Sequence, residues 1–99
     1  MKVYEVVLSP EAQADLLDLY DWVAEQASPI VALRYVERIE DQLRGYAYAP
    51  ERGHRRDDLR PGLRVAGFER RVTIAFMVEE DRTTILRLAY GGRDWESLV

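Results

Sequence analysis

The chain contains no cysteine, and lysine and histidine occur once each, as Lys2 and His54. The absence of thiols excludes disulfides, cysteine nucleophiles and cysteine-bound zinc, and it is typical of a protein in a reducing compartment, so we expect a cytoplasmic location. A single histidine without a helical carboxylate–histidine pair gives no recognisable set of metal ligands, and no glycine pattern for binding phosphate is present. The sequence therefore predicts neither a metal nor a cofactor.

Long apolar stretches are also missing. No run of 18 apolar residues occurs, so we expect no membrane span. The N-terminal residues lack the apolar core and the cleavage site of a secretory signal. A length of 99 residues, 47% of them hydrophobic, fits one globular domain over residues 1–99 with one modest core.

Negative charge predominates, with a formal net charge of −4, but it is unevenly distributed. Residues 1–50 carry four Lys/Arg against nine Asp/Glu, a net of −5, whereas residues 52–71 carry seven arginines against three acids, a net of +4. An acidic body with one arginine-rich segment argues against a general nucleic-acid binder. It indicates a surface directed at a particular partner.

Two serine–proline pairs mark helix starts. Ser9-Pro10 and Ser28-Pro29 each place a good N-cap residue before a proline at the first helical position. They predict a first helix from residue 10 and a second from 29 to about 49, joined as an antiparallel hairpin. Apolar residues at helical spacing mark the buried faces. We expect the acids of the first helix, including Asp15, to form a solvated polar face.

Strand patterns surround this helical hairpin. Residues 2–8 are rich in β-branched residues and predict a strand, and residues 51–62 predict a loop. Alternation then resumes from Leu63, through residues 72–78, and through a row formed by Thr84, Leu86, Leu88 and Tyr90. The short links predict an antiparallel meander. The chain therefore reads as one α+β domain with the helical hairpin on one face of the sheet.

Metal-free RNA cleavage is the one catalytic chemistry that the residues leave open. Arginines can hold a scissile phosphate and stabilise charge in the transition state, and a tyrosine, lysine or histidine can move the proton. Arg64 with Arg71, or Arg87 with Arg93, can converge from neighbouring predicted strands. His54 has no nucleophile near it in sequence and is interpreted as a solvated loop residue.

Four stretches carry a family resemblance: LSPEAQADLLDLYDWVAEQASPIVALRYVERIE, ERGHRRDDLRPGLR, RRVTIAFMV and ILRLAYGGRDW. Together they resemble the ParE branch of the RelE/ParE toxin superfamily over nearly the whole chain. The resemblance implies a β-α-α-β-β-β fold with the helical hairpin packed on a mainly antiparallel sheet. It also implies the toxin component of a type II toxin–antitoxin system, of the kind associated with plasmid stabilisation.

The resemblance also implies partners. A ParD-like antitoxin would bind operator DNA through its ribbon-helix-helix and wrap the toxin with its C-terminal segment. The toxin would then form a hetero-oligomer and reach DNA only through the antitoxin. Studied ParE members inhibit DNA gyrase by binding it, whereas RelE-like members cleave mRNA on the ribosome.

Two positions favour the noncatalytic branch. RelE-like members resemble this chain around Arg64 and Arg93, but they also expect an arginine where this chain has Thr73 and a tyrosine in the C-terminal tail. Tyr90 lies in the last predicted strand instead. We predict a gyrase inhibitor. The alternative is a ribosome-dependent mRNA endoribonuclease using Arg64, Arg87, Arg93 and Tyr90, and a third hypothesis is a binding module that has lost its toxicity.

For the antitoxin we predict an apolar groove between the helical hairpin and the sheet edge, flanked by arginines. A disordered segment that folds onto a partner buries a large area and requires complementary charge. An acidic antitoxin tail would face the arginine-rich segment. The residues expected to contact the antitoxin or the target are Arg60, Arg64, Arg71, Arg93 and Trp95.

Overall fold

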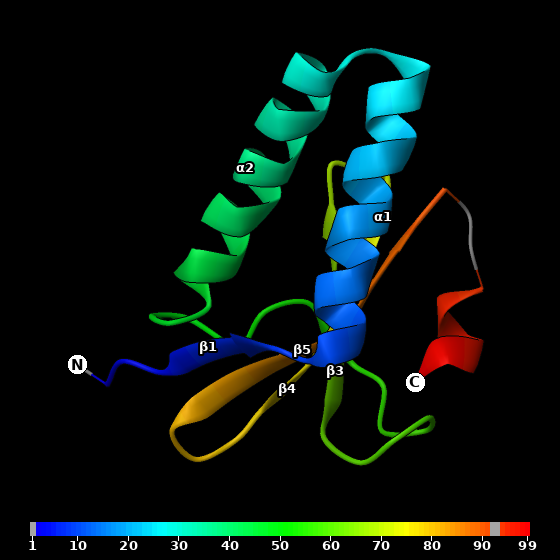
Figure 1. Cartoon of the computed structure of the whole chain (residues 1–99). Coiled ribbons are helices and arrows are strands. Elements are labelled where there is room, and N and C mark those ends of the chain that lie inside the picture. The colour runs from blue at the N-terminus through cyan, green and yellow to red at the C-terminus, as the bar shows by residue number, and fades with distance from the viewer. Residues whose placement is uncertain (1, 92–93) are drawn as a thin grey trace.

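The structure is a computed structural model that describes residues 2–91 and 94–99. Two helices cover one face of a five-stranded sheet (Figure 1). The elements are β1 (Glu5–Leu8), α1 (Pro10–Gln26), α2 (Pro29–Gly45), β2 (His54–Arg55), β3 (Leu63–Phe68), β4 (Val72–Val78), β5 (Arg82–Tyr90) and the 3-10 helix η1 (Trp95–Leu98). Within the described ranges, no helix is long and apolar enough to cross a membrane.

The strand order in the sheet is β1-β5-β4-β3-β2. Strands β2 to β5 pair antiparallel, and β1 pairs parallel with β5. The predicted α+β class, the meander and the position of the helical hairpin are therefore confirmed. The first strand is shorter than the predicted residues 2–8.

Both predicted helix starts are confirmed. The Ser9 hydroxyl accepts the backbone N–H of Ala12 at 3.0 Å, and the Ser28 hydroxyl accepts that of Val31 at 3.2 Å. Each bond satisfies one of the N–H groups that a helix start leaves without an internal partner. Proline follows each serine at the position where its missing N–H costs nothing.

Helix α2 ends at Gly45, so the prediction that it runs to about residue 49 is wrong. Tyr46 is fully buried and its ring lies against Phe76, with ring centroids 4.8 Å apart. The Ala47 carbonyl accepts the backbone N–H of Tyr4 at 2.7 Å. The chain leaves the helix because core packing of the tyrosine and this contact with the start of the sheet outweigh another helical turn.

The predicted loop over residues 51–62 contains the short strand β2. His54 pairs with Val65 on β3. Gly53, at φ +68°, precedes this pair, and a Cβ on Gly53 would lie 1.9 Å from the Val65 carbonyl oxygen. Only glycine allows this approach, so Gly53 is the residue in the sequence that could have indicated the extra strand.

The predicted single-faced row from Thr84 to Tyr90 is also wrong. The register between β4 and β5 shifts from Ala75↔Arg87 to Phe76↔Ile85, which leaves Leu86 as an extra residue. Ile85 and Leu88 both join the core under the helices, while Leu86 packs on the opposite face. Such a bulge redirects neighbouring side chains.

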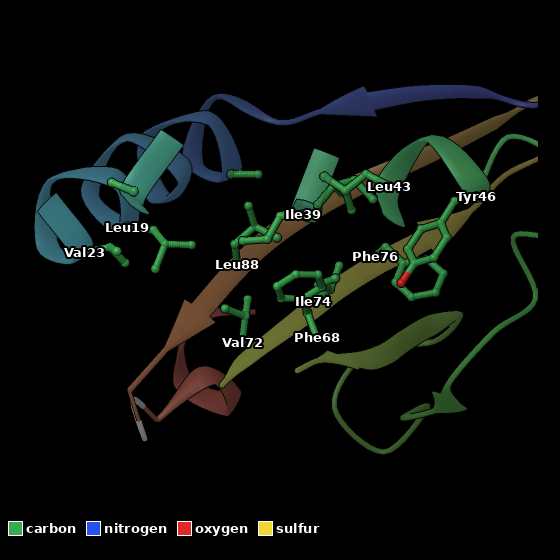
Figure 2. Close-up of a cluster of buried hydrophobic side chains, with 13 residues drawn as sticks. Leu19, Val23, Ile39, Leu43, Tyr46, Phe68, Val72, Ile74, Phe76 and Leu88 are labelled. Atoms are coloured by element: carbon green, nitrogen blue, oxygen red, sulfur yellow. The ribbon is translucent and has the colours of Figure 1, made fainter. Parts of the chain in front are cut away.

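The main core lies between the helices and the sheet, as Figure 2 shows for Leu19, Ile39, Ile74, Phe76 and Leu88. A second, smaller cluster lies on the helix-free face. It consists of Leu63, Val65 and Ala75, with Leu59, Met77, Leu86, Trp95 and Val99 packed against them. The tail therefore covers part of the sheet that the helices leave bare.

Candidate functional site

A groove lies where the tip of the helical hairpin meets the end of the sheet. Its volume is about 350 Å³. Its lining includes Trp22 and Val23 of α1, Tyr35 of α2, Arg70 and Arg71 of the β3–β4 turn, and Tyr90 of β5. We call it the tip groove. It lies between the helical hairpin and the ends of strands β4 and β5, whereas the sequence predicted a groove between the hairpin and the sheet edge.

Aromatic side chains form the walls of the tip groove. The rings of Trp22 and Tyr90 lie 5.6 Å apart at a tilt of 44°. Tyr35 meets Phe68 edge to face, with centroids 5.5 Å apart, and its burial raises the pKa of its hydroxyl above the ordinary value. Trp22 nevertheless keeps 40% of its surface exposed. The groove thus offers rigid apolar area that the described residues leave exposed.

The β3–β4 turn that forms the rim has an unusual backbone. Glu69 and Arg70 have φ values of 48° and 61°, and the Arg71 N–H donates to the Phe68 carbonyl across the turn at 3.0 Å. Hairpin turns with two positive φ angles favour Asn and Gly, so Glu and Arg carry strain here. Strained residues of this kind concentrate at functional sites.

The charges at this rim are not balanced. Arg38 of α2 binds Glu69 with two hydrogen bonds of 2.8 and 3.1 Å, and this partner holds the pKa of the Glu69 carboxyl below its ordinary value. Arg70 and Arg71, by contrast, make no ion pair with any residue in the described ranges. The rim therefore presents two cations to a partner.

The arginines of the segment 52–64 are largely occupied within the chain. Arg56 binds Asp58 at 2.9 Å and Glu96 at 3.2 Å, and its guanidinium lies 5.3 Å from the centroid of the Trp95 ring. Arg55 pairs with Asp57 at 3.1 Å. The local charge of this loop is thus partly neutralised by its own acids, a pairing that counting charges along the sequence does not reveal.

Of the predicted partner-contacting residues that the structure describes, only Arg71 lines the tip groove. Arg64 donates to the Arg52 carbonyl at 3.1 Å, and Arg60 lines a separate hollow below the start of α1. The expected convergence of Arg64 with Arg71 is wrong, because they lie at opposite ends of β3 and its turn. Arg93 lies outside the described residues.

Arg87 has a structural partner that the sequence did not reveal. Its Nε and Nη2 donate to the two carboxylate oxygens of Asp15, each at 2.9 Å, and the backbone N–H of Leu88 donates to the same carboxylate at 2.9 Å. Asp15 is only 3% exposed, so its expected place on a solvated face is wrong. The pair with Asp15 raises the pKa of Arg87.

The short first strand explains why a carboxylate is buried at this point. β1 pairs with β5 only as far as Leu8 and Ile85, so the edge of β5 continues beyond its neighbour. The Ser9 hydroxyl then donates to the Leu86 carbonyl at 2.9 Å, and Asp15 accepts from Leu88. Helix α1 therefore supplies the hydrogen bonds that a longer strand would have made.

The described members of the predicted ribonuclease set lie in three different places. Arg87 is bound to Asp15, Tyr90 packs against Trp22 in the tip groove, and Arg64 lies at the far end of β3. No group of three or more His, Asp or Glu among residues 2–91 and 94–99 is arranged to hold a metal ion. Within these ranges Arg64, Arg87 and Tyr90 do not converge on one point.

Comparison with known proteins supplies an independent finding. The family described as "ParE toxin of type II toxin-antitoxin system, parDE" matches residues 6–95, which include both helices, the sheet and the tip groove. A solved structure described as "Chromosomal ParDE TA system from P. aeruginosa" has 27% sequence identity and a TM-score of 0.78. The similarity covers 89% of this chain and 96% of that chain. The comparison with curated proteins gave no match.

Proposed function

Because the chain belongs to the family of ParE toxins of type II toxin–antitoxin systems, we propose that it arrests growth by binding DNA gyrase and inhibiting it without catalysis. We propose further that a ParD-like antitoxin neutralises it by direct binding, and that only the antitoxin contacts operator DNA. The similarity to the chain from a ParDE system supports an antitoxin partner of this kind.

The observation that carries the antitoxin part of this proposal is the tip groove. An exposed apolar groove with two unpaired arginines at its rim suits a partner segment with apolar anchors and adjacent carboxylates. The antitoxin would place an apolar side chain between Trp22 and Tyr35, and acidic groups at Arg70 and Arg71. Arg70 joins Arg71 in this assignment, in place of Arg60 and Arg64.

The arrangement of the polar residues supports inhibition over cleavage. Cleavage of RNA without a metal requires cations and a proton-transfer group within hydrogen-bonding reach of one phosphate. The Nε and Nη2 groups of Arg87 already donate hydrogen bonds to Asp15, at 2.9 Å each, and Tyr90 lies within the tip groove. Binding of a protein target needs no such convergence.

The proposal is tested with purified gyrase and relaxed plasmid. The protein should block ATP-dependent supercoiling at concentrations near that of gyrase, and prior addition of the cognate antitoxin should restore it. Expression without antitoxin should arrest growth and induce the response to DNA damage. Normal supercoiling in excess protein, together with new codon-phased mRNA ends in the arrested cells, would replace the proposal with the ribonuclease alternative.

A further inference from the structure

The described residues cover only part of the helix-free face of the sheet. Trp95 and Val99 of the tail pack over the half that contains Leu63 and Ala75. The other half carries a row of small side chains across three strands, because Gly67 pairs with Thr73, which pairs with Ala89. Helices α1 and α2 lie on the other face, and the small side chains leave a depression over these strands.

Two adjoining hollows occupy this bare half. Their volumes are about 320 and 300 Å³, and Gly67, Thr73 and Trp95 line both of them. A Cβ on Gly67 would meet no other atom within 4 Å. We call this surface the sheet trough. Gly67, Thr73 and Ala89 form its floor, Trp95 borders it, and Arg70 and Arg71 of the β3–β4 turn lie at its end.

The sheet trough and the tip groove share their cations. Arg70 and Arg71 line both the tip groove and the hollow at the end of the sheet trough. Arg56 also borders the trough, but it is already bound to Asp58 and Glu96. Among residues 2–91 and 94–99, the two arginines of the turn are therefore the cations without an ion pair that both surfaces share.

We propose that the sheet trough is a second docking surface, which takes an extended acidic segment of the toxin's target, and that an antitoxin in the tip groove excludes this segment by occupying Arg70 and Arg71. This inference rests on the proposed function. It adds the surface for the target and the reason why neutralisation and toxicity exclude each other. Two ligands that need the same cations lower each other's affinity by the same factor.

The shape and charge of the trough indicate its occupant. Because Gly67, Thr73 and Ala89 have small side chains, an extended chain can lie close against this part of the sheet. Carboxylates match the two unpaired guanidinium groups of Arg70 and Arg71. A polyanion such as RNA would be repelled by the net charge of −4 that the whole chain carries.

Two substitutions separate the surfaces. Gly67→Phe fills the trough floor, and because Gly67 lies in a strand with open space at its Cβ, the fold should accept an aromatic residue. Trp22→Ala removes a wall of the tip groove and leaves the trough unchanged. Gyrase supercoiling and antitoxin affinity by calorimetry are measured for both variants and for the wild type.

We expect Gly67→Phe to raise the concentration for half-inhibition of gyrase at least about tenfold and to leave antitoxin affinity within about twofold. Trp22→Ala should weaken antitoxin binding by about tenfold or more and leave inhibition unchanged. Combined Arg70→Asp and Arg71→Glu should weaken both. Melting curves check that each variant is folded.

Full inhibition of gyrase by folded Gly67→Phe would overturn the inference and leave the proposed function standing. A wild-type protein that does not inhibit gyrase would remove the proposed function, and this inference with it. A dimer of the wild type that Gly67→Phe dissociates, or binding of a single-stranded RNA oligonucleotide that it abolishes, would overturn the assignment of an acidic protein segment to the trough.

Discussion

At the scale of single residues, Asp15 joins α1 to the sheet. Its carboxylate is almost fully buried, and it accepts three hydrogen bonds, two from Arg87 and one from the backbone of Leu88. A buried charge is tolerated when its partner and its hydrogen bonds are complete, and removal of one member is costly because the other remains unpaired. The pair therefore fixes Arg87 to the body of the protein.

Asp15→Ala should lower the free energy of unfolding by about 3 kcal/mol, because it strands Arg87 and the Leu88 N–H. Urea denaturation measures the loss. The double variant Asp15→Ala with Arg87→Met should lose less than the sum of the two single variants, since it leaves no unpaired guanidinium. Additive losses would show that the two side chains do not stabilise each other.

Asp57 makes stability depend on pH. The Gly62 N–H, which donates to its carboxylate at 2.8 Å, and the nearby Arg55 hold the pKa of Asp57 below its ordinary value. Because the folded pKa is the lower one, the contribution is complete above the unfolded value of about 4 and is lost as the pH falls through the folded pKa. Thermal melts from pH 6 to 2 should fall less steeply for Asp57→Asn than for the wild type below about pH 4. Parallel curves would contradict this account.

At the scale of elements, the N-cap residue of α1 is hydrogen-bonded to the sheet, and that of α2 has no such bond to a described residue. The Ser9 hydroxyl both caps α1 and donates to the Leu86 carbonyl, whereas the Ser28 hydroxyl makes no bond to another described residue besides its cap bond to Val31. Ser9→Ala should therefore cost about 2 kcal/mol of stability and Ser28→Ala about 1. Chemical denaturation of both variants checks the difference, and equal losses would mean that the bond to Leu86 contributes nothing.

In the β3–β4 turn, we expect Arg70 to lower the stability of the fold and to contribute to antitoxin binding. Arg70 has a positive φ, which glycine adopts without strain, so Arg70→Gly should raise the free energy of unfolding by about 1 kcal/mol. The same change removes one of the two unpaired cations and should weaken antitoxin binding. Denaturation and calorimetry on one preparation measure both effects. A variant that is less stable, or that binds equally well, would contradict the interpretation of this turn.

At the scale of the whole molecule, local sequence patterns were enough to predict the architecture, whereas the site depends on contacts between residues far apart in the chain. The serine–proline pairs and the alternation in residues 72–78 predicted helices and strands because they act between near neighbours. The Asp15–Arg87 pair joins residues far apart in the chain, and the bulge at Leu86 depends on the opposite strand. No local pattern encodes either contact.

The charge available to a partner also depends on contacts within the folded chain, and it differs from the charge counted along the sequence. Counting charges assigned a net of +4 to residues 52–71 and directed attention to Arg60 and Arg64. In the folded chain, Arg55 and Arg56 are paired with their own neighbours, and the unpaired rim of the tip groove belongs to Arg70 and Arg71. Charge that a partner can use is what remains after the chain has paired its own groups.

The central claim is that the tip groove holds the antitoxin, and titration calorimetry of the antitoxin's C-terminal segment tests it most directly. Arg70→Asp with Arg71→Glu is compared with the matched control Arg60→Glu with Arg64→Glu. The turn pair should weaken binding by about tenfold or more and reduce its dependence on salt, while the control pair should bind like the wild type. Full affinity in the turn pair, or an equal loss of affinity in both pairs, would contradict the account.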